Sequence, residues 1–389
     1  MNWNDDIRAM FPVTSACTYF DVAYDCGGCT LGRQSAAKYF DDWAVSAAQN
    51  ERGGPGRGVF FRHLGEARVL INQLIGGVGP QQVAFTRNTN EGMNAILQGF
   101  DFKPGDNIIT GDYEHQSVLM PALNLKKTKG VEVRIFPGRE DLSIYPEDLI
   151  ALADEHTRII AVSHVQSATG FCLDLKTLGA WCRAHGVFLL VDAIQSLGQK
   201  PFFAEEWGVD MVTASSYKGL CGEESSGFVY AVPALLEHVW PVYTAAGFVM
   251  GIDRSGDPQI DCDSPGSARK LENSSLDNLG GYIIYDAVKM LLDTGIGRIW
   301  EHINRLYHRL YDGFKDLGYQ VLSFEDDDKH AASLLLGGPD LEALFAFFRE
   351  CNIALTYGHG FMRISVGIFN NDDDVDILLK AAADFMNRQ

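Results

Sequence analysis

Short apolar runs alternate with amphipathic segments through the middle of the chain. Runs that are apolar on both faces are typical of parallel strands that helices cover on both sides. The segments 147–154 and 175–185 carry helical spacing between such runs. The pattern therefore predicts strand–helix–strand units and a largely parallel sheet. The expected strands are residues 107–110, 131–136, 158–163, 187–192, 211–215 and 227–231.

The C-terminal third carries a second and smaller pattern of the same kind. Residues 279–317 have the periodicity of two long helices. We expect a large domain over residues 20–265, and a small domain formed by residues 1–19 together with residues 266–389. The later elements of the small domain are expected as strands at 319–323, 332–336 and 362–366, and as helices at 340–351 and from residue 373 onward.

Length and charge narrow the class of protein. A chain of 389 residues exceeds what a single hydrophobic core usually holds, which agrees with two domains. The net charge of −19 argues against nucleic acid or an anionic membrane as the main partner. No apolar stretch is long enough to cross a membrane, and Asp5 and Asp6 stand where a signal peptide would carry basic residues. We therefore expect a cytoplasmic protein.

The eight cysteines are too sparse for a disulfide framework. Cys172 and Cys182 lie in apolar segments, where free buried thiols are common. Cys26 and Cys29 form a C-x-x-C pair, but no second pair and no paired histidines follow at ligand spacing. We interpret them as two thiols in a glycine-rich loop and expect no metal site.

Candidate chemistry gathers at the ends of two expected strands. Asp192 ends the strand 187–192, at the edge where open α/β sheets bind ligands, although aspartate is also a common helix cap. The next strand ends at Ser215 and is followed by Tyr217 and Lys218. A pyridoxal cofactor requires a lysine to form an imine, an acid beside the pyridine nitrogen and hydroxyls for its phosphate. The pair Asp192 and Lys218 therefore indicates pyridoxal 5′-phosphate.

In ordered segments along nearly its whole length, the chain resembles the class V aminotransferase family of fold-type I pyridoxal phosphate enzymes. That family includes cysteine desulfurases, C–S lyases and isopenicillin N epimerase-like proteins. The resemblance implies an α/β fold with a mostly parallel central sheet in the large domain and a smaller C-terminal α/β domain. The matching segments are 19–23, 86–91, 114–115, 163–166, those around Asp192 and Lys218, and 363–365.

The resemblance implies roles for four residues around the cofactor ring. Lys218 would bind the cofactor covalently and later carry the proton at the substrate Cα. Asp192 would pair with the pyridinium nitrogen, and His115 would stack on the ring. Gln195 would hydrogen-bond the ring oxygen O3′. The expected catalytic residues are therefore Lys218, His115 and Asp192.

The family pattern also implies a phosphate site. Thr89 and Asn90 match the pair at a helix start that takes the phosphate, where the helix N-terminus favours an anion. Ser215 and Tyr217 would complete this site. Ser275 matches a residue that reaches the phosphate of the neighbouring subunit, so the resemblance implies a homodimer with active sites at its interface.

Substrate binding is expected at the other end of the chain. Arg363 matches the arginine that holds the α-carboxylate of the substrate, a bidentate task that suits a guanidinium group. Ala23 falls in the matching substrate loop, and Tyr357 and His359 precede Arg363. The resemblance implies that the substrate is an amino acid or a conjugate of one.

The chain departs from the cysteine desulfurases at the loop before Arg363. Desulfurases carry there the cysteine that accepts sulfur, whereas residues 355–362 contain none. Cys351 is the nearest, and because it ends an apolar helix we expect it to be buried and inert. Persulfide formation is therefore disfavoured. Ser167 also replaces an asparagine of the desulfurases, which leaves the contact near O3′ open.

These observations favour cleavage of a C–S bond in cysteine or a cysteine conjugate by β-elimination. Lys218 would remove the α-proton, and Tyr357 or His359 would protonate the departing thiolate, although His359 fits a surface loop equally well. The same pattern also allows an epimerase or an aminotransferase that acts on a specialised amino acid. A non-catalytic protein with this fold is a further alternative, but Lys218 and Asp192 argue against it.

Overall fold

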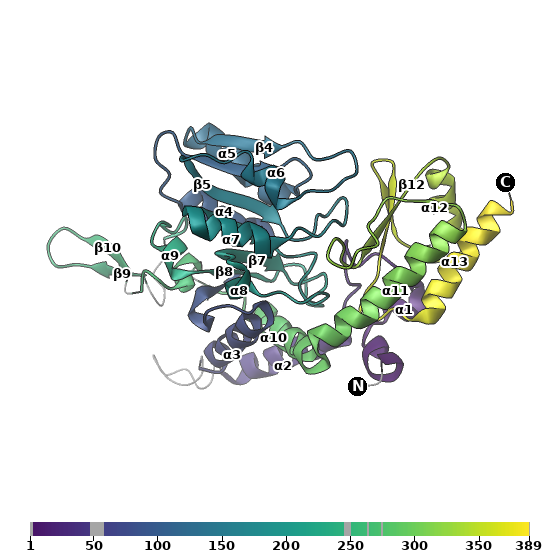
Figure 1. Cartoon of the computed structure of the whole chain (residues 1–389). Coiled ribbons are helices and arrows are strands. Elements are labelled where there is room, and N and C mark those ends of the chain that lie inside the picture. Colours follow the sequence, from purple (N-terminus) through teal and green to yellow (C-terminus); the bar gives the residue numbers. More distant parts are fainter. Residues whose placement is uncertain (1–2, 47–57, 245–249, 263, 274, 389) are drawn as a thin grey trace.

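A seven-stranded sheet forms the centre of the larger part of the computed structural model (Figure 1). The structure describes residues 3–46, 58–244, 250–262, 264–273 and 275–388. The strand β8 runs antiparallel to both of its neighbours and all other pairs are parallel, so the expected mostly parallel sheet is confirmed. The strand order is β2 (Val83–Thr86), β8 (Gly227–Ala231), β7 (Met211–Ser215), β6 (Phe188–Asp192), β5 (Thr157–Ser163), β3 (Asn107–Gly111) and β4 (Glu132–Phe136).

Every strand expected in the large sheet is present, with each bound shifted by one residue at most. Alternate residues of one strand enter different cores, because successive side chains of a strand point to opposite faces. Along β5, Ile160 and Val162 join one core, whereas Ile159 and Ala161 join the other. This two-sided burial is the reason for the continuous apolar runs. The strand β2 is one that the pattern did not indicate.

Helices cover both faces of this sheet. The side chains of α4 (Thr89–Gly99) and α5 (Gln116–Thr128) enter one core, and those of α3 (Gly58–Ile75) and α7 (Leu175–His185) enter the other. The helix α7 has the expected bounds, because Asp174 caps its start and Gly186 ends it with a φ of 67°. Shorter helices lie beside them, namely α6 (Pro146–Ile150), α8 (Ala204–Trp207) and α9 (Pro233–Leu236).

The smaller part of the molecule contains a four-stranded antiparallel sheet, and three helices pack near it. Arg363 lies on a central strand of this sheet, so its position depends on both neighbouring strands. The strands, in sheet order, are β11 (Gln320–Val321), β12 (Ser333–Gly337), β15 (Phe361–Ser365) and β14 (Thr356–Gly358). The helices are α11 (Ile296–Asp316), α12 (Leu341–Glu350) and α13 (Asp372–Met386).

The N-terminal segment packs on the small sheet side. The strand β1 (Thr18–Tyr19) pairs with β13 (Ile353–Ala354), and Arg8 forms an ion pair with Asp374 at 2.7 Å. The turns η1 (Trp3–Ile7) and η2 (Arg8–Met10) and the helix α1 (Val13–Ala16) precede β1. The assignment of residues 1–19 to the small domain stays a prediction.

The helix α10 (Asn278–Thr294) packs against α2 (Thr30–Ser46) and α3, on the side of the large sheet. Gly295, with a φ of 91°, separates α10 from α11, which packs on α13 instead. At Gly295 the chain therefore passes from a helix on the side of the large sheet to a helix that packs beside the small sheet. The domain limits at residues 20–265 and 266–389 stay a prediction.

A two-stranded hairpin projects from the large part of the molecule (Figure 1). It consists of β9 (Met250–Asp253) and β10 (Gln259–Cys262), and Ile252 and Ile260 are exposed on it. The turns η4 (Pro80–Gln82) and η5 (Ala268–Leu271) pack together beside β2. Among the described residues, no helix is both long and apolar enough to span a membrane.

Candidate active site

A cavity of about 670 Å³ lies at the carboxyl ends of β5, β6 and β7. This is the edge of an open α/β sheet at which ligands bind. Arg363 reaches the same cavity from the small sheet. The structure thus brings together most of the residues expected from the sequence: Ala23, Thr89, Asn90, His115, Asp192, Gln195, Ser215, Tyr217, Lys218 and Arg363.

Asp192 is the last residue of β6 and is 2% exposed. Its Oδ1 accepts the backbone N–H of Ile194 at 3.0 Å, whereas Oδ2 has no hydrogen-bond partner among the described residues. Burial raises the pKa of this carboxyl to about 6. A buried carboxylate oxygen without a donor is costly, so the site is built for a cationic N–H that a ligand supplies.

Lys218 follows β7 and is 7% exposed. Burial lowers the pKa of its ammonium group to about 8, and the nearby Arg363 acts in the same direction, whereas Asp192 opposes the shift. The neutral amine is therefore well populated near physiological pH. A neutral lysine amine is the nucleophile that imine formation requires.

Gln195 connects two segments of the chain that line the cavity, those of Ala23 and Ser167. Its Nε2 donates to the carbonyl of Ala23 at 3.0 Å and to Oγ of Ser167 at 3.3 Å. These two bonds use both amide hydrogens, so a contact from Gln195 to a cofactor oxygen requires one of them to be released. Ser167 lines the cavity as well and places a hydroxyl at this edge.

His115 caps the start of α5. Its Nδ1 accepts the backbone N–H of Ser117 at 3.1 Å and lies 2.9 Å from Oγ of the same serine. In the neutral ring the hydrogen is therefore on Nε2. Burial, and secondly the charge of Lys218, lower the pKa of His115. A neutral imidazole suits the predicted stacking on an aromatic cofactor ring.

The start of α4 forms the phosphate end of the cavity. The N–H of Thr89 donates to Oγ of Ser215 at 3.0 Å, and the N–H of Ser215 donates to Oγ1 of Thr89 at 3.0 Å. Gly92, one turn into the helix, lies so close to β7 that a Cβ there would overlap Oγ1 of Thr213. The glycine therefore allows the N-terminus of α4, with its positive potential, to lie against the strand end.

Arg363 is held by groups from two parts of the chain. Its Nη1 donates to the carbonyl of Ser167 at 2.9 Å, and its Nη2 lies 3.7 Å from Oδ1 of Asp21. Nε of Arg363 has no partner among the described residues. The guanidinium group thus retains donor capacity for a substrate carboxylate.

Two residues near the cavity were not assigned roles from the sequence. Glu114 is buried and accepts from the backbone N–H and the hydroxyl of Ser163 and from the amide of Gln166. Burial raises its pKa to about 7, in spite of these bonds. Asp21 contacts Arg363. Both fall in segments that match the family, but only the three-dimensional contacts reveal what they touch.

Three expected site residues lie outside the lining of this cavity. Ser275 lines a separate hollow beside β2 and the start of α4, together with Arg87 and Glu91. Tyr357 lies on β14, where its ring packs 5.8 Å from that of Phe345. His359 is exposed in the turn between β14 and β15, with a φ of 54°. Their predicted roles stay predictions.

The cysteines follow the expectations with one exception. Cys172 and Cys182 are buried free thiols, and Cys26 and Cys29 are also free. The expectation that Cys351 is buried is wrong, because it caps the exposed C-terminal end of α12. None of the described residues that line the cavity is a cysteine.

The residues present fit pyridoxal phosphate. The unpartnered Oδ2 of Asp192 suits a protonated pyridine nitrogen, Lys218 suits the imine, and the start of α4 with Ser215 suits the phosphate. The cavity volume is in the range of cofactor sites, which is about 300–1,000 Å³. Such a site is that of a pyridoxal phosphate-dependent enzyme of fold type I.

The chain belongs to the class V aminotransferase family, because it matches the family described as Aminotransferase class-V over residues 34–378. The expectations of family, fold and cofactor are therefore confirmed. A probable cysteine desulfurase of Methanothermobacter thermautotrophicus is 25% identical, over 96% of both chains. An uncharacterized aminotransferase of Schizosaccharomyces pombe is 25% identical, over 80% of this chain and 79% of its own.

Solved structures show the same fold. The apo cysteine desulfurase of Thermococcus onnurineus superposes with a TM-score of 0.89 at 22% identity, covering 100% of this chain and 99% of the other. A cystine C–S lyase in complex with its product cysteine persulfide has a TM-score of 0.84 at 20% identity, covering 96% and 99%. At this identity the likeness concerns the fold alone.

Proposed function

We propose that this enzyme cleaves the C–S bond of cysteine or of a cysteine conjugate by β-elimination. The observation that carries the proposal is a cavity that Lys218 and Arg363 both line, with no cysteine in its described lining. Bound pyridoxal phosphate supplies an electron sink for the electrons that the substrate Cα releases. The names of a probable cysteine desulfurase and of a cystine C–S lyase among the similar proteins support sulfur chemistry.

Lys218 is the proposed base. Burial lowers the pKa of its amine to about 8, so a substantial fraction of the free amine is neutral near physiological pH. A neutral amine in a buried site accepts the Cα proton. The bond from Cβ to sulfur then breaks, and the sulfur leaves with the electron pair. After hydrolysis the products are a thiol, pyruvate and ammonia.

Arg363 is proposed to orient the substrate through its α-carboxylate. The carbonyl of Ser167 accepts from one guanidinium nitrogen, so the group is already held beside the cavity before the substrate arrives. A fixed guanidinium group selects an amino acid over a simple amine because it offers paired donors to a carboxylate.

The departing thiolate needs a proton, and we propose Tyr357 or His359 as its donor. Both belong to the β14–β15 hairpin that carries Arg363, but neither lines the cavity as described. The donor role therefore requires the hairpin to approach the substrate. The variants Tyr357→Phe and His359→Gln test this role. The variant that removes the proton donor should release thiol more slowly, whereas its rate of Cα-deuterium exchange should be unchanged.

The proposal is tested with the purified holoenzyme and S-methylcysteine. We expect equal amounts of methanethiol and pyruvate, and loss of both in Lys218→Ala. Exchange of the Cα hydrogen for deuterium without thiol release would instead identify an epimerase. Amino-group transfer to a keto acid would identify an aminotransferase.

The variant Cys351→Ser separates lyase from desulfurase chemistry. Cys351 is exposed and precedes the expected substrate hairpin, so it is the residue to test as a sulfur acceptor. We expect its replacement to leave sulfide release from cysteine unchanged. Loss of persulfide formation in this variant would favour a desulfurase.

We also propose that the active unit is a homodimer and that it works in the cytoplasm. Ser275 lies in a hollow next to Glu91, which belongs to the first turn of α4, the helix whose start is the proposed phosphate site. Phe40 and Trp43 expose about half of their surface on α2, which is the kind of apolar area that subunit contacts cover.

A further inference from the structure

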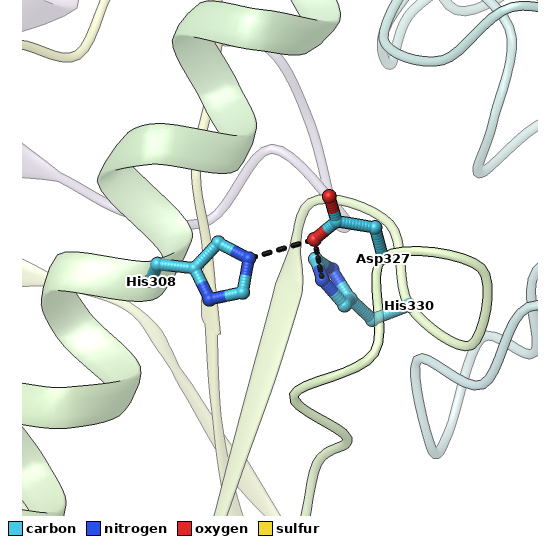
Figure 2. Close-up of side chains that lie close together, drawn as sticks. All are labelled: His308, Asp327 and His330. Atoms are coloured by element: carbon cyan, nitrogen blue, oxygen red, sulfur yellow. Dashed lines mark hydrogen bonds and ion pairs between the residues drawn. The ribbon is translucent and has the colours of Figure 1, made fainter.

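Three potential ligands meet between α11 and the loop that precedes β12 (Figure 2). His308 projects from α11, and Asp327 and His330 lie in the loop. Nε2 of His308 is 2.7 Å from Oδ1 of Asp327, and Nε2 of His330 is 3.5 Å from the same oxygen. The ligand atoms of the three side chains all lie within 4.8 Å of one another. None of them lines the active-site cavity.

The hydrogen bonds of His330 fix which nitrogen is free. Its Nδ1 lies 2.8 Å from the carbonyl oxygen of Ala331, which is an acceptor, so Nδ1 carries the hydrogen and donates it. Nε2 therefore presents a lone pair. This is the arrangement found in metal-binding histidines, where a hydrogen bond at one nitrogen orients the other towards the metal.

This lone pair is buried without a donor. His330 is 1% exposed, and its Nε2 has no hydrogen-bond partner within the described part of the chain. It faces the carboxylate of Asp327, which also only accepts. A cation between the two groups would satisfy the buried nitrogen of His330 and the exposed carboxylate of Asp327 together.

The surrounding contacts hold the ligands in place. The ring of Tyr307 stacks on His330 with centroids 3.7 Å apart and an angle of 7° between the planes. Lys200 donates to the carbonyl of Asp327 at 2.6 Å and to that of His330 at 2.8 Å. The loop is thus anchored through its backbone, and its side chains remain available.

The charges near the cluster also favour a cation. Residues 325–328 are four successive acidic residues, and Asp326, Asp327 and Asp328 are exposed. The nearby ammonium group of Lys200 points at backbone carbonyls and lies 4.5 Å from the centre of the Trp300 ring. Lys329 pairs with Asp326 at 3.7 Å, which leaves acidic groups in excess.

We propose that His308, Asp327 and His330 bind one divalent transition-metal ion of the zinc type. The ligands are Nε2 of each histidine and a carboxylate oxygen of Asp327, with a fourth position open to water. Two imidazoles and a carboxylate suit zinc and its neighbours, whereas calcium and magnesium prefer oxygen ligands alone. His308 gives up its hydrogen bond to Asp327 when the ion enters.

The position of the cluster indicates a structural effect. The backbone N–H of Cys172, in the large part of the molecule, donates to the carbonyl of Lys329 at 3.0 Å. Phe171 also pairs with His330 in an isolated bridge. A metal ion here would join α11 to the loop that contacts the large sheet side. We therefore expect binding to raise the melting temperature.

The sequence did not indicate this site. His308 and Asp327 are 19 residues apart and lie on a helix and in a loop, which is not the spacing of a short metal motif. The tautomer of His330 and the burial of its lone pair are visible only in three dimensions.

The experiment uses the holoenzyme after treatment with a chelator, titrated with zinc sulfate in a calorimeter and with cobalt chloride in a spectrophotometer. We expect saturable binding of one ion per chain and the visible absorption bands of tetrahedral cobalt. The melting temperature should rise with added zinc, because an ion that binds the folded state stabilises it.

Matched variants assign the ligands. Asp327→Asn and His308→Gln should weaken binding at least about tenfold, since even outer residues of metal sites have effects of that size. Asp328→Asn removes the same charge from the same loop, and His156→Gln removes an exposed histidine elsewhere, so both should bind normally. Absence of saturable binding, or equal affinity in all four variants, would overturn the proposal.

Discussion

Nη2 of Arg363 lies 3.7 Å from Oδ1 of Asp21, so the predicted substrate-binding guanidinium already faces a carboxylate of its own chain. Thr356 donates to that same oxygen at 2.7 Å and fixes its position. Burial raises the pKa of Asp21, although Thr356 and Arg363 both oppose the shift. The internal carboxylate therefore competes with the carboxylate of an incoming substrate.

The competition predicts the effect of Asp21→Asn. Removing the negative charge should strengthen the attraction between Arg363 and a substrate carboxylate, and should lower KM several-fold with a smaller change in kcat. Steady-state kinetics with S-methylcysteine measure both constants. Asp25→Asn changes the same charge in the cavity lining, and because Asp25 bonds Gly27 instead, a smaller effect on KM is expected. A rise in KM for Asp21→Asn would mean that Asp21 chiefly positions the arginine.

The pKa of Lys218 predicts how the apoenzyme takes up pyridoxal phosphate. Burial lowers this pKa to about 8, and only the neutral amine attacks the aldehyde. Below pH 8 the uptake rate should therefore rise about tenfold per pH unit, and above pH 8 it should level off. Stopped-flow absorbance of the apoenzyme mixed with cofactor measures the rate. A profile that rises steadily through pH 10 would contradict the lowered pKa.

Asp192→Asn should reduce kcat by at least about a hundredfold, because a neutral amide does not hold the ring nitrogen protonated. The visible absorbance of bound cofactor should persist, since Lys218 and the phosphate site are intact. Asp210→Asn is the matched control. Burial raises the pKa of Asp210 to about 6 as well, but this residue does not line the cavity. Its replacement should affect stability and leave kcat nearly unchanged.

Ser275→Ala tests the shared active site. If Ser275 binds the phosphate held by a second copy, its replacement should weaken cofactor retention by about tenfold or more, as loss of one hydrogen bond to a charged group does. Dialysis followed by absorbance measures retention, and light scattering measures the mass of the particle. A monomer with unchanged cofactor affinity would refute both the dimer and the role of Ser275.

Local patterns predicted the large sheet well. The strands β5 and β6 are buried on both faces, so their apolar runs stand out in any sequence window. Asp192 and Lys218 were also accessible from the sequence, because a strand end is a position that the pattern itself defines. The helix limits followed where a cap such as Asp174 or Gly186 marks them.

Features that depend on distant segments could not be predicted in this way. The pairing of Asp21 with Arg363 joins the two ends of the chain. Glu114 is charged and lies in a polar stretch, yet tertiary packing buries it. Cys351 ends an apolar helix, but the helix end itself is exposed, and no periodicity reveals that difference.

The absence of a side chain at Gly92 limits which substitutions the phosphate end of the cavity tolerates. Glycine inside a helix ordinarily lowers stability by about 1 kcal/mol relative to alanine, so most helices gain from its replacement. Here a methyl group would meet Thr213 and push the first turn of α4 away from β7. The position is therefore closed to an otherwise favourable substitution, because only glycine lets the start of α4 lie this close to β7.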